Sequence, residues 1–145
     1  MASIPVKILR EGALLPTYGS PEAAGADLYA CLESTVIIEP GKTAFVPTGI
    51  AMEVPKGCAG LIYARSGLAC KRGLAPANKV GVVDSDYRGE IIVALHNHGS
   101  ESQTIGHGER IAQMVITPVL TPAYEAVSDL NDTQRGVGGF GSTGK

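Results

Sequence analysis

KVGVVDSDYRGEIIVALHN, at residues 79–97, is the stretch that decides the fold. Two apolar runs, at residues 80–83 and 90–95, flank a segment at 84–89 that holds two carboxylates, a tyrosine and an arginine. β-Branched residues favour strands, and Asp, Ser and Gly favour turns, so the stretch is predicted to form a β-hairpin with a polar tip. Alone, such a tip is more often a hydrophilic turn than a functional site. The other segments of the chain strengthen the functional interpretation of this tip.

Turn signals recur along the rest of the chain at intervals of roughly 8 to 15 residues, which is typical of sandwich and jelly-roll folds and not of βαβ units. Residues 14–24 are predicted to form a loop. Residues 64–73 allow one short helix that ends at a glycine. The fold class expected is all-β, a jelly-roll-like barrel or sandwich with one short helix. Strands are predicted at residues 4–9, 24–30, 36–38, 43–54 (a pair broken at 47–49), 58–63, 103–105 and 109–116.

Length and composition favour a single domain with small-molecule chemistry. The 145 residues fit one domain, and the 19 glycines indicate many tight turns. A net charge of -2 provides no general field that would attract polyanions. No nucleic-acid partner is therefore expected, and any phosphate binding must come from a few placed groups.

The cysteines and the N-terminal residues predict where in the cell the protein is located. Cys31, Cys58 and Cys70 are odd in number and lack C-x-x-C spacing, so a reducing compartment is expected, without a disulfide framework or zinc site. The N-terminal residues have no long apolar region, and no run approaches the length of a membrane span. We expect a soluble, cytoplasmic protein with no membrane partner.

Other polar residues outside the central stretch admit two interpretations each. Asp27 stands in the small apolar run at 24–30, where it either faces outward, pairs with a base or serves a site. Arg65 and Ser66 begin the predicted helix, where N–H groups, a hydroxyl and a guanidinium suit a phosphate, although an ordinary capped helix has the same pattern. His96 and His98 share one face of a strand, but without a third ligand a structural or solvent role is favoured over a metal pair.

The tail at residues 135–145 reads RGVGGFGSTGK and matches two nucleotide-binding patterns on paper. It contains G-x-G-x-x-G and, at residues 139–145, G-x-x-x-x-G-K. Both interpretations fail on context, because no strand leads in and no helix can follow. The remaining alternatives are a disordered terminus and a flexible strip of backbone donors that closes over a phosphorylated base.

Five segments, in order, carry a resemblance to one known family: AGADLYA (24–30), RSGLACK (65–71), GVVDSDYRGE (81–90), GERIAQ (108–113) and RGVGGFGSTG (135–144). Together they resemble the homotrimeric deoxyuridine triphosphatases, or dUTPases, over nearly the whole chain. The resemblance implies a jelly-roll domain at residues 1–134 and a mobile C-terminal arm at 135–145. It also implies a homotrimer whose active sites are built from more than one chain.

The resemblance further implies hydrolysis of dUTP to dUMP and pyrophosphate, which keeps uracil out of DNA and supplies dUMP for thymidylate synthesis. Asp84 is the expected general base for the water that attacks the α-phosphorus. Tyr87 is expected under the deoxyribose, where it excludes a 2′-hydroxyl, and Asn78 with the backbone around Val83 is expected to read the uracil. Mg2+ is the expected cofactor, held mainly by the triphosphate, with Asp27 approaching it through water. Further substrate contacts are expected from Arg65, Ser66, Gly67 and Gln113 at the phosphates, and from Arg135, Phe140, Gly141, Ser142 and Thr143 of the arm.

One departure and two rival functions accompany this resemblance. The arginine-serine motif usually follows proline in the family, and here Ala64 takes that position, which loosens the backbone entering the phosphate site. A dCTP deaminase shares the trimeric fold, but its chain is longer and its base is a glutamate. A non-enzymatic, dUTPase-like regulatory protein would show lesions in the catalytic motifs. The Asp84 and Tyr87 pair and the intact tail favour dUTP hydrolysis.

Overall fold

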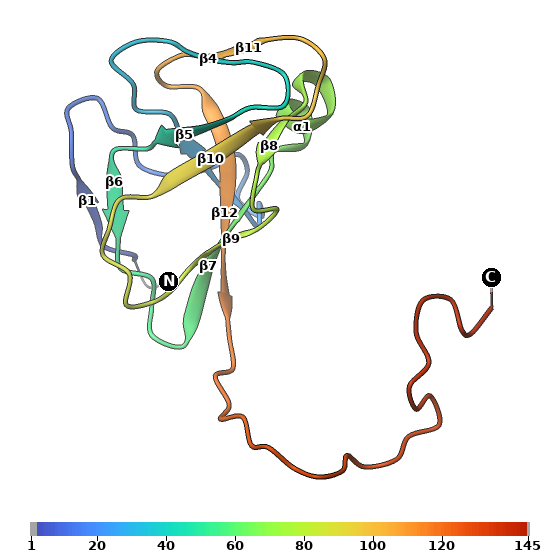
Figure 1. Cartoon of the computed structure of the whole chain (residues 1–145). Helices are drawn as coiled ribbons and strands as arrows, with labels where there is room; N and C mark the ends of the chain where they lie inside the picture. Colours follow the sequence, from blue (N-terminus) through green and yellow to red (C-terminus); the bar gives the residue numbers. More distant parts are fainter. Residues whose placement is uncertain (1–2, 145) are drawn as a thin grey trace.

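The computed structural model describes residues 3–144, and among these it contains twelve strands and one short helix (Figure 1). The expected all-β class with a single helix is confirmed. The elements are β1 (Val6–Ile8), β2 (Thr17–Tyr18), β3 (Ala26–Tyr29), β4 (Val36–Ile38), β5 (Thr43–Pro47), β6 (Ile50–Met52), β7 (Cys58–Tyr63), α1 (Ser66–Arg72), β8 (Leu74–Pro76), β9 (Gly81–Val83), β10 (Ile92–Asn97), β11 (Gln103–Ile105) and β12 (Arg110–Pro118).

The strands form two main sheets and two smaller pairs in a jelly-roll-like arrangement (Figure 1). The larger sheet has the order β2-β3-β12-β7-β9, and the second has the order β5-β10-β8. The pairs β1-β6 and β4-β11 complete the fold. Every pairing is antiparallel, so each strand can bury one face and expose the other.

Alternating residues from both main sheets meet in one core. Leu28 and Ile111 of the larger sheet and Val46 and Leu95 of the smaller one are fully buried in a single cluster. Burying such a side chain contributes about 1.5–3 kcal/mol relative to exposure. Asn97 is also fully buried, and its amide donates to two backbone carbonyl oxygens at 2.8 Å and accepts a backbone N–H at 2.9 Å. The buried amide is therefore satisfied at the end of β10.

The predicted hairpin at residues 79–97 is wrong. Both apolar runs do become strands, but β9 pairs with β7 in the larger sheet, whereas β10 pairs with β5 and β8 in the smaller one. The polar segment between Val83 and Ile92 thus connects two sheets. Two apolar runs around a turn satisfy either arrangement locally, and the choice depends on which sheet edge each strand can complete.

The short helix is confirmed where the sequence predicted it. Gly73 ends α1 in the left-handed conformation, with φ of 66°. A Cβ on Gly73 would lie 2.8 Å from the backbone nitrogen of Gly99, so glycine is also required by close packing. No helix within residues 3–144 is long and apolar enough to cross a membrane.

Most short strands are confirmed, but their partners were not foreseen. β5 and β6 arise from the predicted pair at residues 43–54, yet β5 joins β10 and β6 joins β1. β2 lies within the segment predicted to be a loop, and β8 was not predicted. Both are two or three residues long, too short for a pattern to detect. The predicted strands at residues 4–9, 24–30, 36–38, 58–63, 103–105 and 109–116 correspond to β1, β3, β4, β7, β11 and β12.

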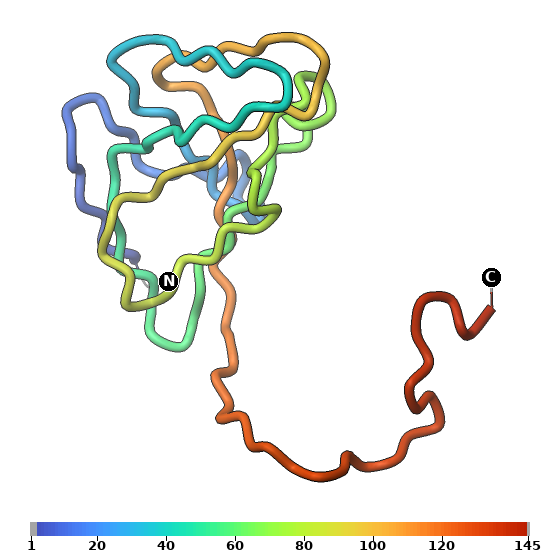
Figure 2. The backbone as a smooth tube through the Cα atoms, in the orientation of Figure 1, coloured from blue at the N-terminus to red at the C-terminus, as the bar shows by residue number. Residues whose placement is uncertain are grey.

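The C-terminal segment leaves the barrel after β12 (Figure 2). The last backbone hydrogen bond to the folded part joins the N–H of Val119 to the carbonyl of Gly57 at 2.9 Å. Beyond it, side chains such as Leu120 and Tyr124 are almost fully exposed. The predicted boundary between residues 134 and 135, and the mobility of the arm, remain predictions, and residues 1, 2 and 145 lie outside the described residues.

Candidate active site

A pocket of about 220 Å³ lies along β9 and the turn that follows it. It brings together four of the predicted site residues: Asn78, Val83, Asp84 and Tyr87. Val83 is buried, whereas the side chains of Asp84 and Tyr87 are exposed. The pocket is smaller than most drug-sized ligand pockets, so it suits a small ligand or one part of a larger ligand.

The turn after β9 is held by its own backbone and by the tyrosine. The N–H of Tyr87 donates to the carbonyl of Asp84 at 3.2 Å, as in a β-turn, and the Tyr87 hydroxyl donates to the carbonyl of Glu90 at 2.9 Å. The ring folds back over Gly89, where a Cβ would lie 2.4 Å from the Tyr87 hydroxyl oxygen. Glycine at this position therefore allows the ring to lie against its own turn.

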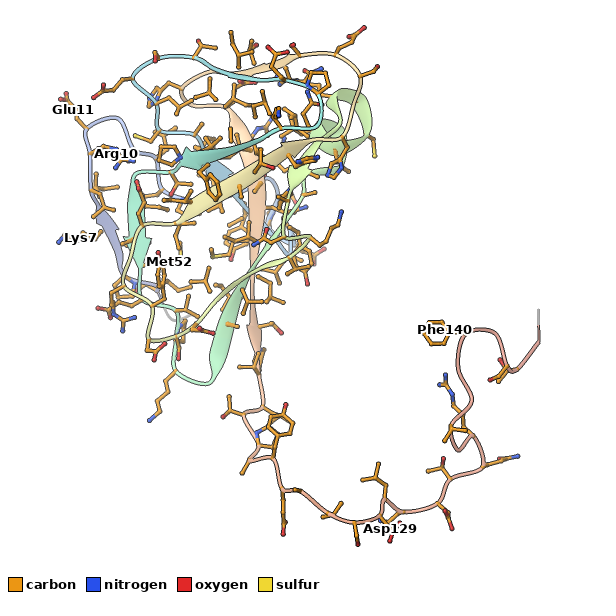
Figure 3. All side chains as sticks on the ribbon, viewed as in Figure 1. Lys7, Arg10, Glu11, Met52, Asp129 and Phe140 are labelled. Carbon is orange, nitrogen blue, oxygen red and sulfur yellow. The ribbon has the colours of Figure 1, made fainter. Side chains whose placement is uncertain are left out.

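Glu90, at the far end of this turn, is clamped to a distant part of the chain. Its Oε1 accepts the backbone N–H of Gly49 at 3.0 Å and forms an ion pair with Nη2 of Arg10. The hydrogen bond to Glu90 raises the pKa of Arg10 above its ordinary value. Glu90 also lines the pocket, while Arg10 lies at the end of β1 (Figure 3). Sequence reasoning missed this clamp, because nothing in a single sequence joins residues 80 positions apart.

We expect the Arg10 and Glu90 clamp to position the turn that carries Asp84. Glu90→Ala should lower kcat/KM about tenfold, equal to about 1.4 kcal/mol of transition-state stabilisation, because the turn loses its anchor. Glu90→Gln should lower kcat/KM less than Glu90→Ala does, because the amide oxygen can still accept the backbone N–H of Gly49. Steady-state kinetics measure both effects. Glu53→Gln is the matched control, because Glu53 is exposed and its nearest ion pair, to Arg88, spans 3.9 Å. An unchanged kcat/KM for Glu90→Ala would contradict the role.

A second cluster of predicted residues forms where β3, β7 and β12 lie side by side. Arg65 Nε donates to Asp27 Oδ1 at 2.8 Å, and Nη1 of Arg110 lies 3.6 Å from Asp27 Oδ2. Gln113 pairs with Asp27 across the strands, and its amide donates to the carbonyl of Ala64 at 2.9 Å. The pairing of Asp27 with a base, one of the alternatives left open, is thus observed. Arg110 was not predicted as a site residue.

The close packing of this cluster depends on one glycine. A Cβ on Gly25 would lie 2.4 Å from Oε1 of Gln113, so only glycine lets Gln113 reach Ala64. The bond to the Ala64 carbonyl holds the backbone that enters α1. Beyond it, Ser66 and Gly67 are exposed at the start of α1, which has no side-chain cap and no acidic residue in its first turn.

Asp84 and the second cluster lie at opposite ends of β7. Val83 is paired with Gly60, so Asp84 comes level with Ala59, whereas Arg65 follows the other end of the strand at Tyr63. At about 3.3 Å per residue, the four residues from 59 to 63 already separate the two levels by roughly 13 Å. Asn78 lies at the Tyr63 end of the pocket, beside Gly81, which pairs with Ile62. Within one chain, Asp84 and Arg65 therefore lie at different levels of the sheet.

The arm residues lie away from both groups. Phe140 is fully exposed and projects from the distal part of the arm (Figure 3). Arg135 Nε donates to the carbonyl of Gly138 at 2.8 Å, and Ser142 donates its backbone N–H to the carbonyl of Gly139. Gly141 and Thr143 lie in the same exposed segment. One chain thus carries three separate groups of predicted site residues.

These features define a class of protein: a jelly-roll-like β subunit with a small pocket beside a carboxylate, a separate arginine-centred cluster and a long extended arm. A family model described as dUTPase matches residues 11–144. The chain is 52% identical to the deoxyuridine 5'-triphosphate nucleotidohydrolase of Desulfitobacterium hafniense, over 99% of each chain. The chain belongs to the dUTPase family.

Solved structures agree with this assignment. A variant of the dUTPase of Staphylococcus bacteriophage 80alpha with dUpNHpp matches with a TM-score of 0.90 and 28% identity, covering 100% of both chains. A variant of the dUTPase from phage phi11 of S. aureus matches with a TM-score of 0.82 and 25% identity, covering 90% of this chain and 100% of that one. The latter structure is described as revealing the coordination of a structural Mg(II) ion.

Proposed function

We propose that this chain hydrolyses dUTP to dUMP and pyrophosphate. Membership of the dUTPase family makes it a nucleotide diphosphohydrolase, and the observation that carries the chemistry is the pocket that joins Asn78, Val83, Asp84 and Tyr87. The residues that line the pocket include an exposed carboxylate, an amide and an aromatic ring.

Asp84 is the general base of this proposal. Its side chain is exposed at the end of β9 and lines the pocket, so a water molecule can reach it. A carboxylate at hydrogen-bond range can orient that water in line with the α-phosphorus and accept its proton. The leaving group is then pyrophosphate, and dUMP remains in the pocket.

The pocket itself selects the nucleoside. The Asn78 amide lies beside Gly81. An amide and backbone groups can match the donor and acceptor order of uracil and reject cytosine, and backbone close to the base would leave no room for the thymine methyl group. The Tyr87 ring, fixed by its hydroxyl, forms the barrier to a 2′-hydroxyl.

The phosphates are bound by the second cluster and the arm. Arg65, with Ser66, Gly67 and Gln113 nearby, offers a guanidinium, a hydroxyl, backbone N–H groups and an amide. Arg135 pairs with the γ-phosphate, Ser142 and Thr143 donate to it, and Phe140 stacks on the base with Gly141 beside it. Residues 135–145 thus act as a lid on the domain at 1–134.

Mg2+ is the proposed cofactor, held mainly by the triphosphate. No cluster of three or more His, Cys, Asp or Glu within residues 3–144 could hold a metal, and Mg2+ commonly binds through phosphate oxygens and water. Asp27 fits a contact through water, because its Oδ2 lies 3.6 Å from Arg110, too far for a strong hydrogen bond. When bound, the ion neutralises charge on the phosphates.

The active enzyme is proposed to be a homotrimer with shared sites. The estimated separation of Asp84 from Arg65 along β7 supports this, because the phosphates of a nucleotide at Asp84 must meet basic groups from another copy. Val82 and Ile92, which line the pocket, are 63% and 46% exposed. Apolar side chains beside a site favour a subunit contact there.

Mixing two inactive variants tests this sharing. We expect that Asp84→Asn chains and chains truncated after Gln134 regain activity after subunit exchange, since a hybrid site can take Asp84 from one chain and the arm from another. Random mixing restores up to about a quarter of the sites. Native mass spectrometry must show hybrids, and each variant incubated alone is the control. No activity in proven hybrids would mean that each site uses one chain only.

The decisive test of function is a nucleotide panel. The purified protein with Mg2+ is incubated with dUTP, dCTP, dTTP and UTP while pyrophosphate is measured. Release from dUTP alone is expected, whereas ammonia released from dCTP would identify a deaminase. Cytoplasmic location is part of the proposal, supported by three free cysteines, which fit a reducing compartment.

A further inference from the structure

Two of the three histidines of the chain lie against each other at the end of β10, away from the pocket. The ring centres of His96 and His98 are 4.5 Å apart, with an interplanar angle of 62°. Successive residues of a strand alternate in direction, so positions two apart project from the same face. The N–H of His98 donates to the carbonyl of Gly73 at 2.8 Å, which extends the pairing with the β8 side beyond Asn97. The backbone that carries the pair is therefore held by the sheet.

The spacing of the rings matches the spacing of two imidazoles on one ion. With a metal–nitrogen bond of about 2.0–2.1 Å, imidazoles at adjacent coordination positions have ring centres about 4.5 to 5 Å apart. No third His, Cys, Asp or Glu completes such a group within residues 3–144, so water must supply the remaining ligands. Imidazole nitrogen suits Cu2+, Ni2+ and Zn2+, whereas Mg2+ prefers oxygen.

A neighbouring hydroxyl orients one of the two rings. Nδ1 of His96 lies 2.8 Å from Oγ1 of Thr43, its cross-strand neighbour. When Nδ1–H donates to this hydroxyl, Nε2 keeps its lone pair, which is the arrangement commonly found behind metal-bound histidines. Thr43 therefore provides an outer contact that selects the ligating nitrogen.

We propose that His96 and His98 form a two-nitrogen surface site for a late divalent transition metal, Cu2+ or Ni2+ in preference to Zn2+, with water at the other positions. The site goes beyond dUTP hydrolysis and does not depend on it. The pair lies at the end of β10 opposite Ile92, and neither histidine lines the pocket.

Calorimetric titration of the full-length protein with Ni2+ in the absence of nucleotide tests the proposal. We expect one ion per chain, at least about tenfold weaker binding for His96→Ala and for His98→Ala, and about tenfold weaker binding for Thr43→Val. His107→Ala is the matched control, because its ring accepts the backbone N–H of Leu32 and lies apart from the pair. Cys70→Ser, which removes an exposed thiol, should leave binding unchanged.

Electron paramagnetic resonance of the Cu2+ complex provides a second measurement. Two nitrogen ligands are expected in the native protein and one in either histidine variant. Unchanged hydrolysis of dUTP with Mg2+ by the His96→Ala and His98→Ala variants shows that these variants are folded. No binding at about 1 mM Ni2+, or equal binding by the His96→Ala/His98→Ala double variant, would overturn the site.

Discussion

Asp84→Asn is expected to lower kcat for dUTP about 10²- to 10⁴-fold while the affinity for a non-hydrolysable dUTP analogue changes little. The amide keeps the shape and hydrogen-bonding size of the side chain but cannot accept a proton from the attacking water. The Asp84 side chain is exposed and the pocket is otherwise unaltered, so folding should not be affected. Single-turnover kinetics and calorimetric binding of the analogue separate the two effects.

The same turn offers a matched control for this prediction. Asp86 is an exposed carboxylate two residues away, but it does not line the pocket. Asp86→Asn should therefore lose far less activity. Equal losses for the two variants would show that the charge of the turn, and not one positioned base, is what matters.

Truncation after Gln134 is expected to lower kcat/KM at least about 100-fold while the melting temperature stays nearly unchanged. The described residues beyond Val119 make no backbone hydrogen bond to the barrel, so their removal takes nothing from the core. Activity falls because Arg135, Ser142 and Thr143 no longer reach the phosphates and Phe140 no longer covers the base. Closure of the arm would also exclude water from the site.

The arm should be ordered only when it closes on ligand. Five of the nine residues at 136–144 are glycine, so ordering them is entropically costly without compensating contacts. A protease that cleaves the arm in the free enzyme should act more slowly with the analogue and Mg2+ present. Val137→Ala is the control, because it changes an exposed arm residue without an assigned contact. The analogue should slow cleavage of this variant as it does that of the native arm. Equal cleavage rates with saturating ligand would refute a lid.

Sequence reasoning identified the individual elements better than their partners. The helix ending at Gly73 and the strand at Cys58–Tyr63 follow from local chemistry, namely a glycine C-cap and an apolar run between turns. The hairpin at residues 79–97 failed because the local pattern is the same whether two strands pair together or separate into different sheets. The missing information was which edges β7, β5 and β8 left for them.

For the candidate site too, sequence reasoning identified individual residues better than their distant contacts. The resemblance implied that Asp84, Tyr87 and Asn78 act on one nucleoside, and all three line the pocket along β9. The clamp from Arg10 to Glu90 and the contact of Arg110 with Asp27 could not be predicted, because they join residues that no spacing rule connects.

By itself, the sequence determined the all-β class, the dUTPase motifs and the chemistry each motif can perform, because residue type and local spacing carry that information. Only the tertiary structure decided that β9 and β10 enter different sheets. It also decided that Asp84 and Arg65 lie at opposite ends of β7. These outcomes depend on strand pairing and burial between distant segments, whose free energy is set by the whole core and not by any one stretch of chain.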